Sequence, residues 1–439
     1  MNRAGFCAAL VALGLTSATH ALTLEAALAR TLQNNPEIRA ARLRVEEAAG
    51  QRLVLRATGL PDVRVDVPGG LQGGKRSGER SVQPFAFAQG AFTQPVFSYG
   101  LPATFRRADL EVLIAEQRLN AVVLEQLHTA RLAYCTAAYN DSLRAVGEAQ
   151  RTRLAANAQT QNERVQAGQA ERAAVSSAQV LEHAATPRIE ESRRASSAAR
   201  LQLATAMGER LTSDLPGPEG ELTFAAVELD VDAETQVALE RRTDLKLARL
   251  LVRAAREDER IAQAGYFPQI AATVSGTYIP ISDIRRGSEG SARRSDDIVS
   301  SEARAGVAYT WRVIDNGRTG GVVLRQRALR EANEAVLAKL EADVPRELLR
   351  LRNNLRALAS RQEALSKASN VAEQTVRDVQ SNLAQGLSSQ LEYRNAETNF
   401  LQTRGGLLSV AYEQNVALAE RDRITGRYFQ FSEKPQRVH

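Results

Sequence analysis

The stretch Ala303-Arg-Ala-Gly-Val-Ala-Tyr-Thr-Trp-Arg-Val313 decides the fold of this chain. Its odd positions are apolar or small, whereas Arg304 and Arg312 stand at even positions. Alternation with a period of two is typical of a β-strand, because successive side chains point to opposite faces. About ten residues with one apolar and one polar face is the pattern of a transmembrane barrel strand. The alternative is a soluble sheet with one face in water.

Three further segments follow the same rule. Gln269–Tyr278 alternates, Val63–Val67 places Arg64 and Asp66 opposite its valines, and Phe85–Phe87 continues the pattern. Aromatic residues gather in or beside these segments, as in the interfacial girdles of a barrel; they include Phe92, Phe97, Tyr99, Phe105, Tyr266 and Phe267. The sequence therefore predicts four strands with one face in lipid.

Four strands cannot close a barrel, and bare strand edges are not tolerated in lipid. The barrel must then be shared between chains. Two chains would give a barrel filled by side chains, and three would give about twelve strands with a lumen. Arg64, Asp66, Arg304 and Arg312 are the residues expected to face that lumen.

A narrow apolar seam predicts a long coiled-coil helix over about 321–384. Its members recur at steps of three, four or seven, which is typical of a coiled coil: Leu337, Leu340, Val344, Leu348, Leu351, Leu355, Leu358, Leu365, Ala372, Val376, Val379 and Leu383. Such a helix would be roughly 100 Å long. Pro345 lies inside the seam and predicts a kink or break, and Pro187 raises the same expectation in the first half.

The sequence contains two copies of one unit. A shift of 207 residues places Ile38 on Leu245 and Pro61 on Pro268, and a shift of 218 places Gly168 on Gly386. Each copy is predicted to contain a first helix, two strands around a polar Gly-rich loop, a long helix and, after a glycine, a return helix. The first helix covers Leu24 to about Leu55 in one copy and about Thr235 to Ala264 in the other. The long helix covers about Leu101–Gln166 and about Gly321–Ala384. The predicted repeats are 22–215 and 216–427, with Pro216-Gly-Pro218 as linker and 428–439 as a C-terminal tail.

Composition limits the function classes. Charged residues make up 25% of the chain and the net charge is +6, but the arginines alternate with acids. A nucleic-acid-binding surface would show a one-sided basic stripe, and none is present in the sequence.

Residues 1–21 have the basic start, short apolar core and small residues of a signal peptide, with cleavage expected after Ala21.

In their order and duplication, these features resemble the TolC family of outer-membrane efflux proteins. The resemblance covers nearly the whole chain after residue 21 and includes Tyr266-Phe-Pro268 before one strand and Trp311-Arg-Val-Ile-Asp-Asn-Gly317 after another. It implies a mainly α fold with a β-barrel portion: long helical hairpins, and four strands per chain in a shared trimeric, twelve-stranded barrel. It also implies an outer-membrane location in a Gram-negative bacterium and extension into the periplasm. The implied partners are a homotrimer, a periplasmic adaptor (membrane fusion) protein, an inner-membrane transporter and outer-membrane lipid.

The resemblance assigns two kinds of site residue. Gly168 and Gln169, and Gly386 and Leu387, match the hairpin tips that meet the adaptor.

Acidic residues just beyond the second tip narrow the periplasmic aperture in this family. Glu392 stands at one such position, and Asn395 replaces the next acid. A threefold ring of Glu392 would attract cations. A solvated helix face is the alternative for this residue.

No catalytic, metal or cofactor site emerges from the sequence. Gly69–Lys75 resembles the start of a P-loop, but Arg76 replaces the required Ser or Thr, so it is interpreted as a flexible strand–strand loop. Cys135 has no partner cysteine after residue 21 and is expected to be a small buried residue.

The sequence thus favours a passive exit duct coupled to an inner-membrane pump, for efflux or type I secretion. A structural envelope spacer or adhesin without conduction is the alternative.

Overall fold

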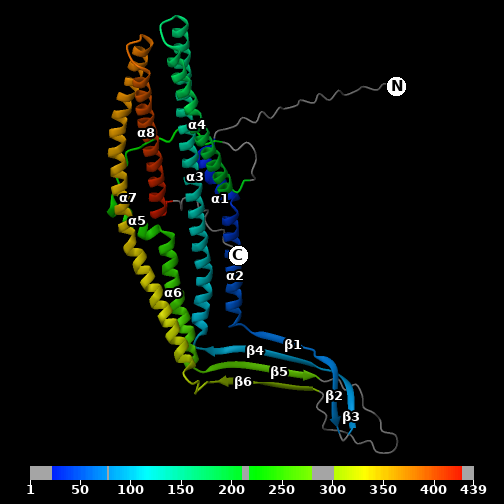
Figure 1. Cartoon of the computed structure of the whole chain (residues 1–439). Coiled ribbons are helices and arrows are strands. Elements are labelled where there is room, and N and C mark those ends of the chain that lie inside the picture. The colour runs from blue at the N-terminus through cyan, green and yellow to red at the C-terminus, as the bar shows by residue number, and fades with distance from the viewer. Residues whose placement is uncertain (1–21, 77–78, 210–216, 279–300, 428–439) are drawn as a thin grey trace, which may run out of the picture. The chain divides into compact units, whose positions relative to one another are not determined.

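The computed structural model describes residues 22–76, 79–209, 217–278 and 301–427 (Figure 1). The chain divides into two units. The first comprises Met1–Arg39, Val122–Ala238 and Pro345–His439, and the second comprises Ala40–Ala121 and Leu239–Val344. The predicted signal peptide and C-terminal tail lie outside the described residues.

Both halves of the chain place their elements in the same order. The first half contains α1 (Leu24–Asn34), α2 (Pro36–Ala57), β1 (Asp62–Asp66), β2 (Gly69–Arg76), β3 (Glu79–Ala86), β4 (Ala88–Ser98), α3 (Leu101–Gln166) and α4 (Arg172–Met207). The second contains α5 (Val231–Arg241), α6 (Thr243–Gln263), the short 3-10 helix η1 (Ala264–Tyr266), β5 (Gln269–Tyr278), β6 (Ser301–Thr310), α7 (Arg318–Ala384) and α8 (Gln390–Ile424). The mainly helical fold with two long helical hairpins and a few strands is confirmed.

The first helix of each copy is in fact two helices, so the prediction of one continuous helix is wrong. The chain turns at Asn35, whose Oδ1 accepts hydrogen bonds from the backbone N–H groups of Glu37 (2.8 Å) and Ile38 (3.2 Å). Asn35 thereby caps α2, and Pro36 occupies the first helical position, where proline lacks only an unneeded N–H. In the second copy the turn falls at Arg242, which has an extended ψ of 123°.

Of the kink or break expected at each of the two prolines, the break is wrong. α7 runs through Pro345 and α4 runs through Pro187 without interruption. A helix-interior proline costs about 3 kcal/mol. Beside Pro345, however, Val344 and Leu348 are fully buried, and this burial offsets the lost hydrogen bond. Every predicted member of the α7 seam is buried or half-buried, so the seam itself is confirmed.

In the first unit, one core cluster joins all four long helices. Leu154 of α3, Ala185 of α4, Leu383 of α7 and Tyr393 of α8 are buried together. In the second unit, Leu110 and Ile114 of α3 pack with Ala254 of α6. Ala185 and Ala254 are small side chains that let the helices approach closely at these two points.

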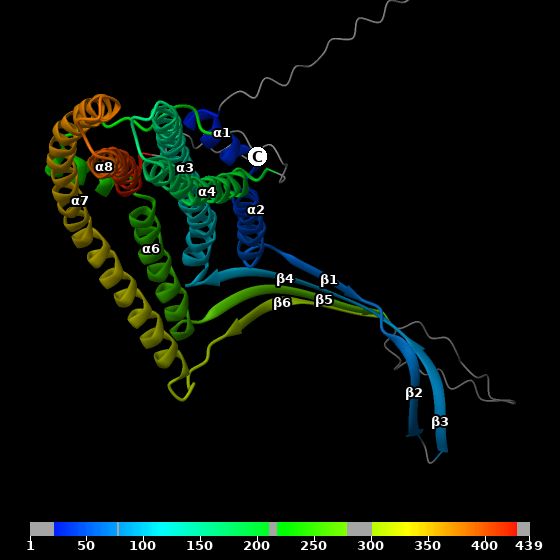
Figure 2. The ribbon, with the colours of Figure 1, turned by 45° about the horizontal axis from the view of Figure 1, so that its top comes forward.

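The second unit contains an antiparallel sheet with strand order β1-β4-β5-β6. A separate ribbon, β2 paired with β3, continues beyond the ends of β5 and β6 (Figure 2). The interpretation of Gly69–Lys75 as a flexible loop is therefore wrong. These residues pair with Arg80–Ala86, since an antiparallel ladder requires only backbone groups and tolerates a glycine-rich edge strand.

Candidate functional site

The four-stranded sheet has one polar and one apolar face. Residues directly opposite one another across a ladder share a face, and the register gives one row from edge to edge: Arg64, Ala91, Ser275 and Arg304. The next row on the same face is Asp66, Gln89, Thr277 and Glu302. Ion pairs link neighbours on this face, Arg64 Nε to Asp66 Oδ2 at 3.3 Å and Arg304 Nε to Glu302 Oε1 at 2.6 Å. The sheet thus brings three of the four predicted lumen residues together.

Arg312 is the exception. β6 ends at Thr310, so Arg312 lies two residues beyond the strand, in the segment that leads to α7. The sequence alternation continues past the strand end because Trp311 and Val313 are also apolar. Alternation alone does not mark where pairing stops.

The opposite face of the sheet is apolar and exposed. Its first row is Val63, Phe92, Val274 and Ala305, and its second is Val65, Gly90, Gly276 and Ala303. Val65 is 69% exposed and Val307 is 70% exposed. No described part of the chain covers this face, and an uncovered apolar surface of this extent marks a contact with lipid or protein.

The sheet also has two open edges. β1 and β6 each pair on one side only among the described residues. Strand directions alternate across the sheet, so β1 and β6 run in opposite directions. A β6 edge can therefore pair with the β1 edge of another copy and keep the antiparallel pattern.

The two hairpin tips have the same local geometry. Gly168 (φ 71°) and Gly386 (φ 78°) are left-handed, a conformation that favours glycine. After each glycine the chain closes a Schellman turn, with Gln169 N donating to Arg164 O (2.8 Å) and Leu387 N donating to Asn382 O (2.8 Å). The tips lie within the predicted turns, and both Gln169 and Leu387 are exposed.

Arg164 connects the two tips. Its Nη1 donates to the Leu383 carbonyl oxygen at 2.8 Å, one of the last carbonyls of α7. A Cβ on Gly386 would lie 2.9 Å from Arg164 Nη2, so a larger residue there would displace the end of this arginine side chain. Arg164 therefore adds a second donor to a helix-end carbonyl that already accepts from Gly386 N (3.1 Å), and it fixes α3 against α7.

Glu392 and Asn395 lie in the first turns of α8, and both are exposed. Glu392 has a local role that the sequence reasoning missed. Its Oε2 accepts from Ser389 N at 2.9 Å, while Ser389 Oγ accepts from Glu392 N at 3.2 Å. This is a capping box, and the Ser-x-x-Glu spacing was the signal that could have revealed it.

A buried charge cluster near this position was not expected from the sequence. Glu397 of α8 is 2% exposed. Its carboxylate accepts from Arg153 of α3 at two atoms, Nε (2.9 Å) and Nη2 (3.2 Å), and from the Tyr393 hydroxyl (3.3 Å). Arg153 also lies over the Phe400 ring, 5.3 Å from its centroid. Burial raises the pKa of Tyr393, and the hydrogen bond to Glu397 raises the pKa of Arg153, so both keep their protons.

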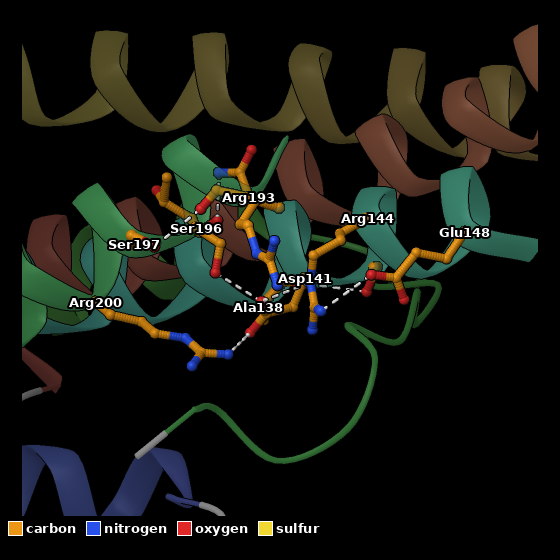
Figure 3. A network of polar contacts seen from close by, with 11 residues as sticks. Ala138, Asp141, Arg144, Glu148, Arg193, Ser196, Ser197 and Arg200 are labelled. Atoms are coloured by element: carbon orange, nitrogen blue, oxygen red, sulfur yellow. Dashed lines mark hydrogen bonds and ion pairs between the residues drawn. The ribbon is translucent and has the colours of Figure 1, made fainter. Parts of the chain in front are cut away.

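A second polar cluster holds the α3–α4 hairpin (Figure 3). Asp141 of α3 accepts from Ser196 Oγ and from Arg200 Nη2 of α4, both at 2.6 Å. Arg144 lies 4.0 Å from the same carboxylate and pairs with Glu148 one turn later. Two helix-spanning bonds on one carboxylate make this a positional clamp between the two helices.

The described residues contain no group of three side chains suited to hold a metal ion. Cys135 is buried, and burial raises its pKa to about 11, so its thiol stays protonated near neutral pH. Within the described ranges, none of the helices combines the length and apolar character that a bilayer crossing needs.

Several solved structures share this fold. VceC from Vibrio cholerae superimposes with a TM-score of 0.75 at 18% identity, covering 92% of this chain and 96% of that one. CmeC from Campylobacter jejuni superimposes with a TM-score of 0.77 at 14% identity, covering 94% of this chain and 87% of that one. The open state of MtrE from Neisseria gonorrhoeae superimposes with a TM-score of 0.71 at 21% identity, covering 92% of this chain and 88% of that one. Among curated proteins, no sequence match is found.

The family comparison also finds the two copies. The family model for outer membrane efflux proteins matches residues 27–209 and again residues 235–427. Each match spans one copy of the order helix pair, strands, long helix and return helix. The chain therefore belongs to the outer membrane efflux protein family.

Proposed function

We propose that this chain forms an outer-membrane channel, a passive exit duct for an inner-membrane pump. The observation that carries the proposal is the two-faced sheet with open edges. An apolar face that nothing in the described chain covers suits lipid, and a polar face with Arg64, Asp66 and Arg304 suits water. CmeC and MtrE, which share the fold, are both described as outer membrane channels.

Closure of the sheet argues for a homotrimer. Four strands per chain would give about twelve in three copies, enough for a water-filled lumen, whereas two copies would give a barrel filled by side chains. The antiparallel relation of β6 to a neighbouring β1 permits closure without a bare edge. The polar face would then line the lumen, and the apolar face would meet outer-membrane lipid.

The helical hairpins would cross the periplasm and meet a periplasmic adaptor at their tips. Gly168, Gln169, Gly386 and Leu387 are exposed at the turns, and Leu387 offers an apolar side chain that is 74% exposed. A signal peptide at 1–21 would direct the chain to export. The proposal needs no cofactor and no catalytic residue, because the pump supplies the energy.

The test of the channel is assembly and conduction. The purified protein should require detergent, migrate as a crosslinkable trimer, and conduct ions in planar bilayers. A water-soluble monomer, or a trimer without conductance, would refute the channel and favour a spacer or adhesin.

The aperture is proposed at Glu392 and Asn395. Because Glu392 also belongs to the capping box, its two roles must be separated. Glu392→Ala should lower the preference of the mouth for cations by removing a ring of negative charge. Ser389→Ala is the matched control, since it weakens the same cap and keeps the carboxylate. Equal conductance and selectivity in Glu392→Ala and the unmodified protein would remove Glu392 from the aperture.

A further inference from the structure

An arginine-rich groove lies between α3 and α6 in the second unit. It has a volume of about 390 Å³. Its lining consists of two facing stripes with helical spacing, Arg106, Asp109, Leu110 and Leu113 on α3 and Arg253, Arg256, Glu257 and Arg260 on α6. Neither the duct nor the hairpin tips use these residues.

The groove carries an excess of positive charge. Glu257 is almost buried and accepts from both Arg106 (3.0 Å) and Arg260 (2.6 Å), so two cations share one carboxylate. Each of these arginines is about half exposed and keeps further N–H donors directed at solvent. The remaining carboxylate, Asp109, is already paired with Arg56 at 2.7 Å.

Arg253 and Arg256 add to this excess. Arg256 pairs outside the groove, with Glu334 of α7 at 3.0 Å. Arg253 is exposed and has no ion-pair partner among the described residues. The arrangement therefore presents guanidinium groups to an anion, with buried Leu110 at the floor and half-exposed Leu113 at the rim.

The groove lies close to a belt of aromatic and apolar side chains at the ends of the strands. Tyr99 stacks on Phe267 with ring centroids 4.1 Å apart, and the Trp311 indole N–H donates to the Tyr266 carbonyl at 3.2 Å. Trp311 is 51% exposed, and Ile314, in the same loop, is 82% exposed. Exposed aromatic residues at strand ends mark a membrane–water interface.

The depth of the groove matches the headgroup layer. Arg106 lies five residues into α3, or about 8 Å along the helix, and Arg260 lies three residues from the end of α6, or about 5 Å. The polar layer on each side of a bilayer is about 5–8 Å thick. Arg106 and Arg260 thus sit at the level of lipid phosphates rather than at that of the acyl chains, whereas Arg253, ten residues from the end of α6, lies about 15 Å along the helix and beyond this layer.

We infer that the groove between α3 and α6 binds the phosphate headgroup of an anionic phospholipid from the leaflet that adjoins the helices. This inference rests on the proposed membrane-spanning sheet. Guanidinium groups bind phosphate oxygens in pairs of charge-assisted hydrogen bonds.

The experiment titrates the delipidated, detergent-solubilised trimer with short-chain phosphatidylglycerol and with phosphatidylcholine, and counts bound lipid by native mass spectrometry. Arg260→Gln should weaken phosphatidylglycerol binding about fivefold, and Arg106→Gln with Arg260→Gln about 25-fold, because each basic residue near an anionic lipid surface contributes about a factor of five. Asp109→Asn should tighten binding, since it removes a negative charge from the same groove. Phosphatidylcholine should bind weakly to all variants.

The control is Arg193→Gln with Arg377→Gln, which removes two exposed arginines from the first unit and should leave binding unchanged. Equal binding of both lipids, weaker binding in Asp109→Asn, or no effect of the double groove variant would overturn the inference. Competition by glycerol phosphate at the concentration of the lipid would assign the groove to a soluble anion instead and would equally overturn it. A trimer that conducts but shows no headgroup preference refutes only the groove, whereas loss of the trimer refutes the channel.

Discussion

Replacing Arg153 by Met tests whether the buried cluster around Glu397 holds the two hairpins together. The substitution keeps an unbranched apolar stem but removes the guanidinium group and its charge. Glu397 is 2% exposed, so its carboxylate would lose both guanidinium bonds without access to water. The Tyr393 hydroxyl, at 3.3 Å, would remain as a single neutral donor.

The expected cost follows from that geometry. Removing one partner of a buried ion pair destabilises a protein by about 3–5 kcal/mol, because a charge is left uncompensated. Loss of the cation–π contact with Phe400 adds about 0.5–1 kcal/mol. For a unit of this size, 1 kcal/mol corresponds to about 2–4 °C in Tm, so Arg153→Met should lower Tm by about 7–24 °C.

The double variant Arg153→Met with Glu397→Leu distinguishes the ion pair from simple packing. Replacing a buried pair by apolar residues is often neutral or stabilising, so this variant should regain most of the lost Tm. Thermal unfolding of the purified protein is followed by circular dichroism at 222 nm, with Arg193→Met, which replaces an exposed arginine, as control. A Tm loss in the double variant equal to the sum of the single losses would refute the reasoning.

Three further predictions concern the sheet, the tips and the lone thiol. Val65→Arg should cost about 2–4 kcal/mol at the bilayer midplane and reduce the yield of SDS-resistant trimer, while Asp66→Arg on the polar face should not. Gly386→Ala should lower Tm more than Gly168→Ala does, since both lose a left-handed glycine but only the first displaces Arg164; equal losses would contradict this role. Burial raises the pKa of the Cys135 thiol from 9.0 to about 11, so this residue should resist maleimide at pH 7. As the pH rises, the thiol ionises in the unfolded chain before it ionises in the folded protein. The contribution of Cys135 to stability should therefore fall between about pH 9 and 11. Rapid labelling of the folded protein would contradict its burial.

The long helices could be predicted almost to the residue because their signal is periodic and repeated. The seam from Leu337 to Leu383 samples one face over many turns, so single errors hardly matter, and Gly168 and Gly386 mark the ends directly. Breaks inside helices are harder to predict, because the conformational preference of one residue competes with the packing of the residues around it. Asn35 ends a helix by capping the next one, whereas Pro345 does not, since its neighbours are buried on both sides.

The polar clusters could not be predicted because they depend on which helix faces pair. Arg153 and Glu397 are 244 residues apart in sequence. Nothing in either helix alone distinguishes them from the many exposed Arg and Glu residues of the chain. Glu392 was singled out by resemblance, but its bond to Ser389 is purely local and could have been found from the spacing.

The sheet shows how a single backbone irregularity decides which side chains lie on its apolar face. Phe92 and Phe97 of β4 differ by an odd number of residues, so strict alternation would place them on opposite faces. The register shifts between Pro95 and Phe97, where Val96 is the extra residue. Pro95 has no N–H to donate to a ladder, and a bulge beside it is the usual accommodation. The bulge returns Phe97 to the apolar face, opposite Ile270 and in the same row as Tyr309, and so completes the aromatic belt at the end where the strands join the helices.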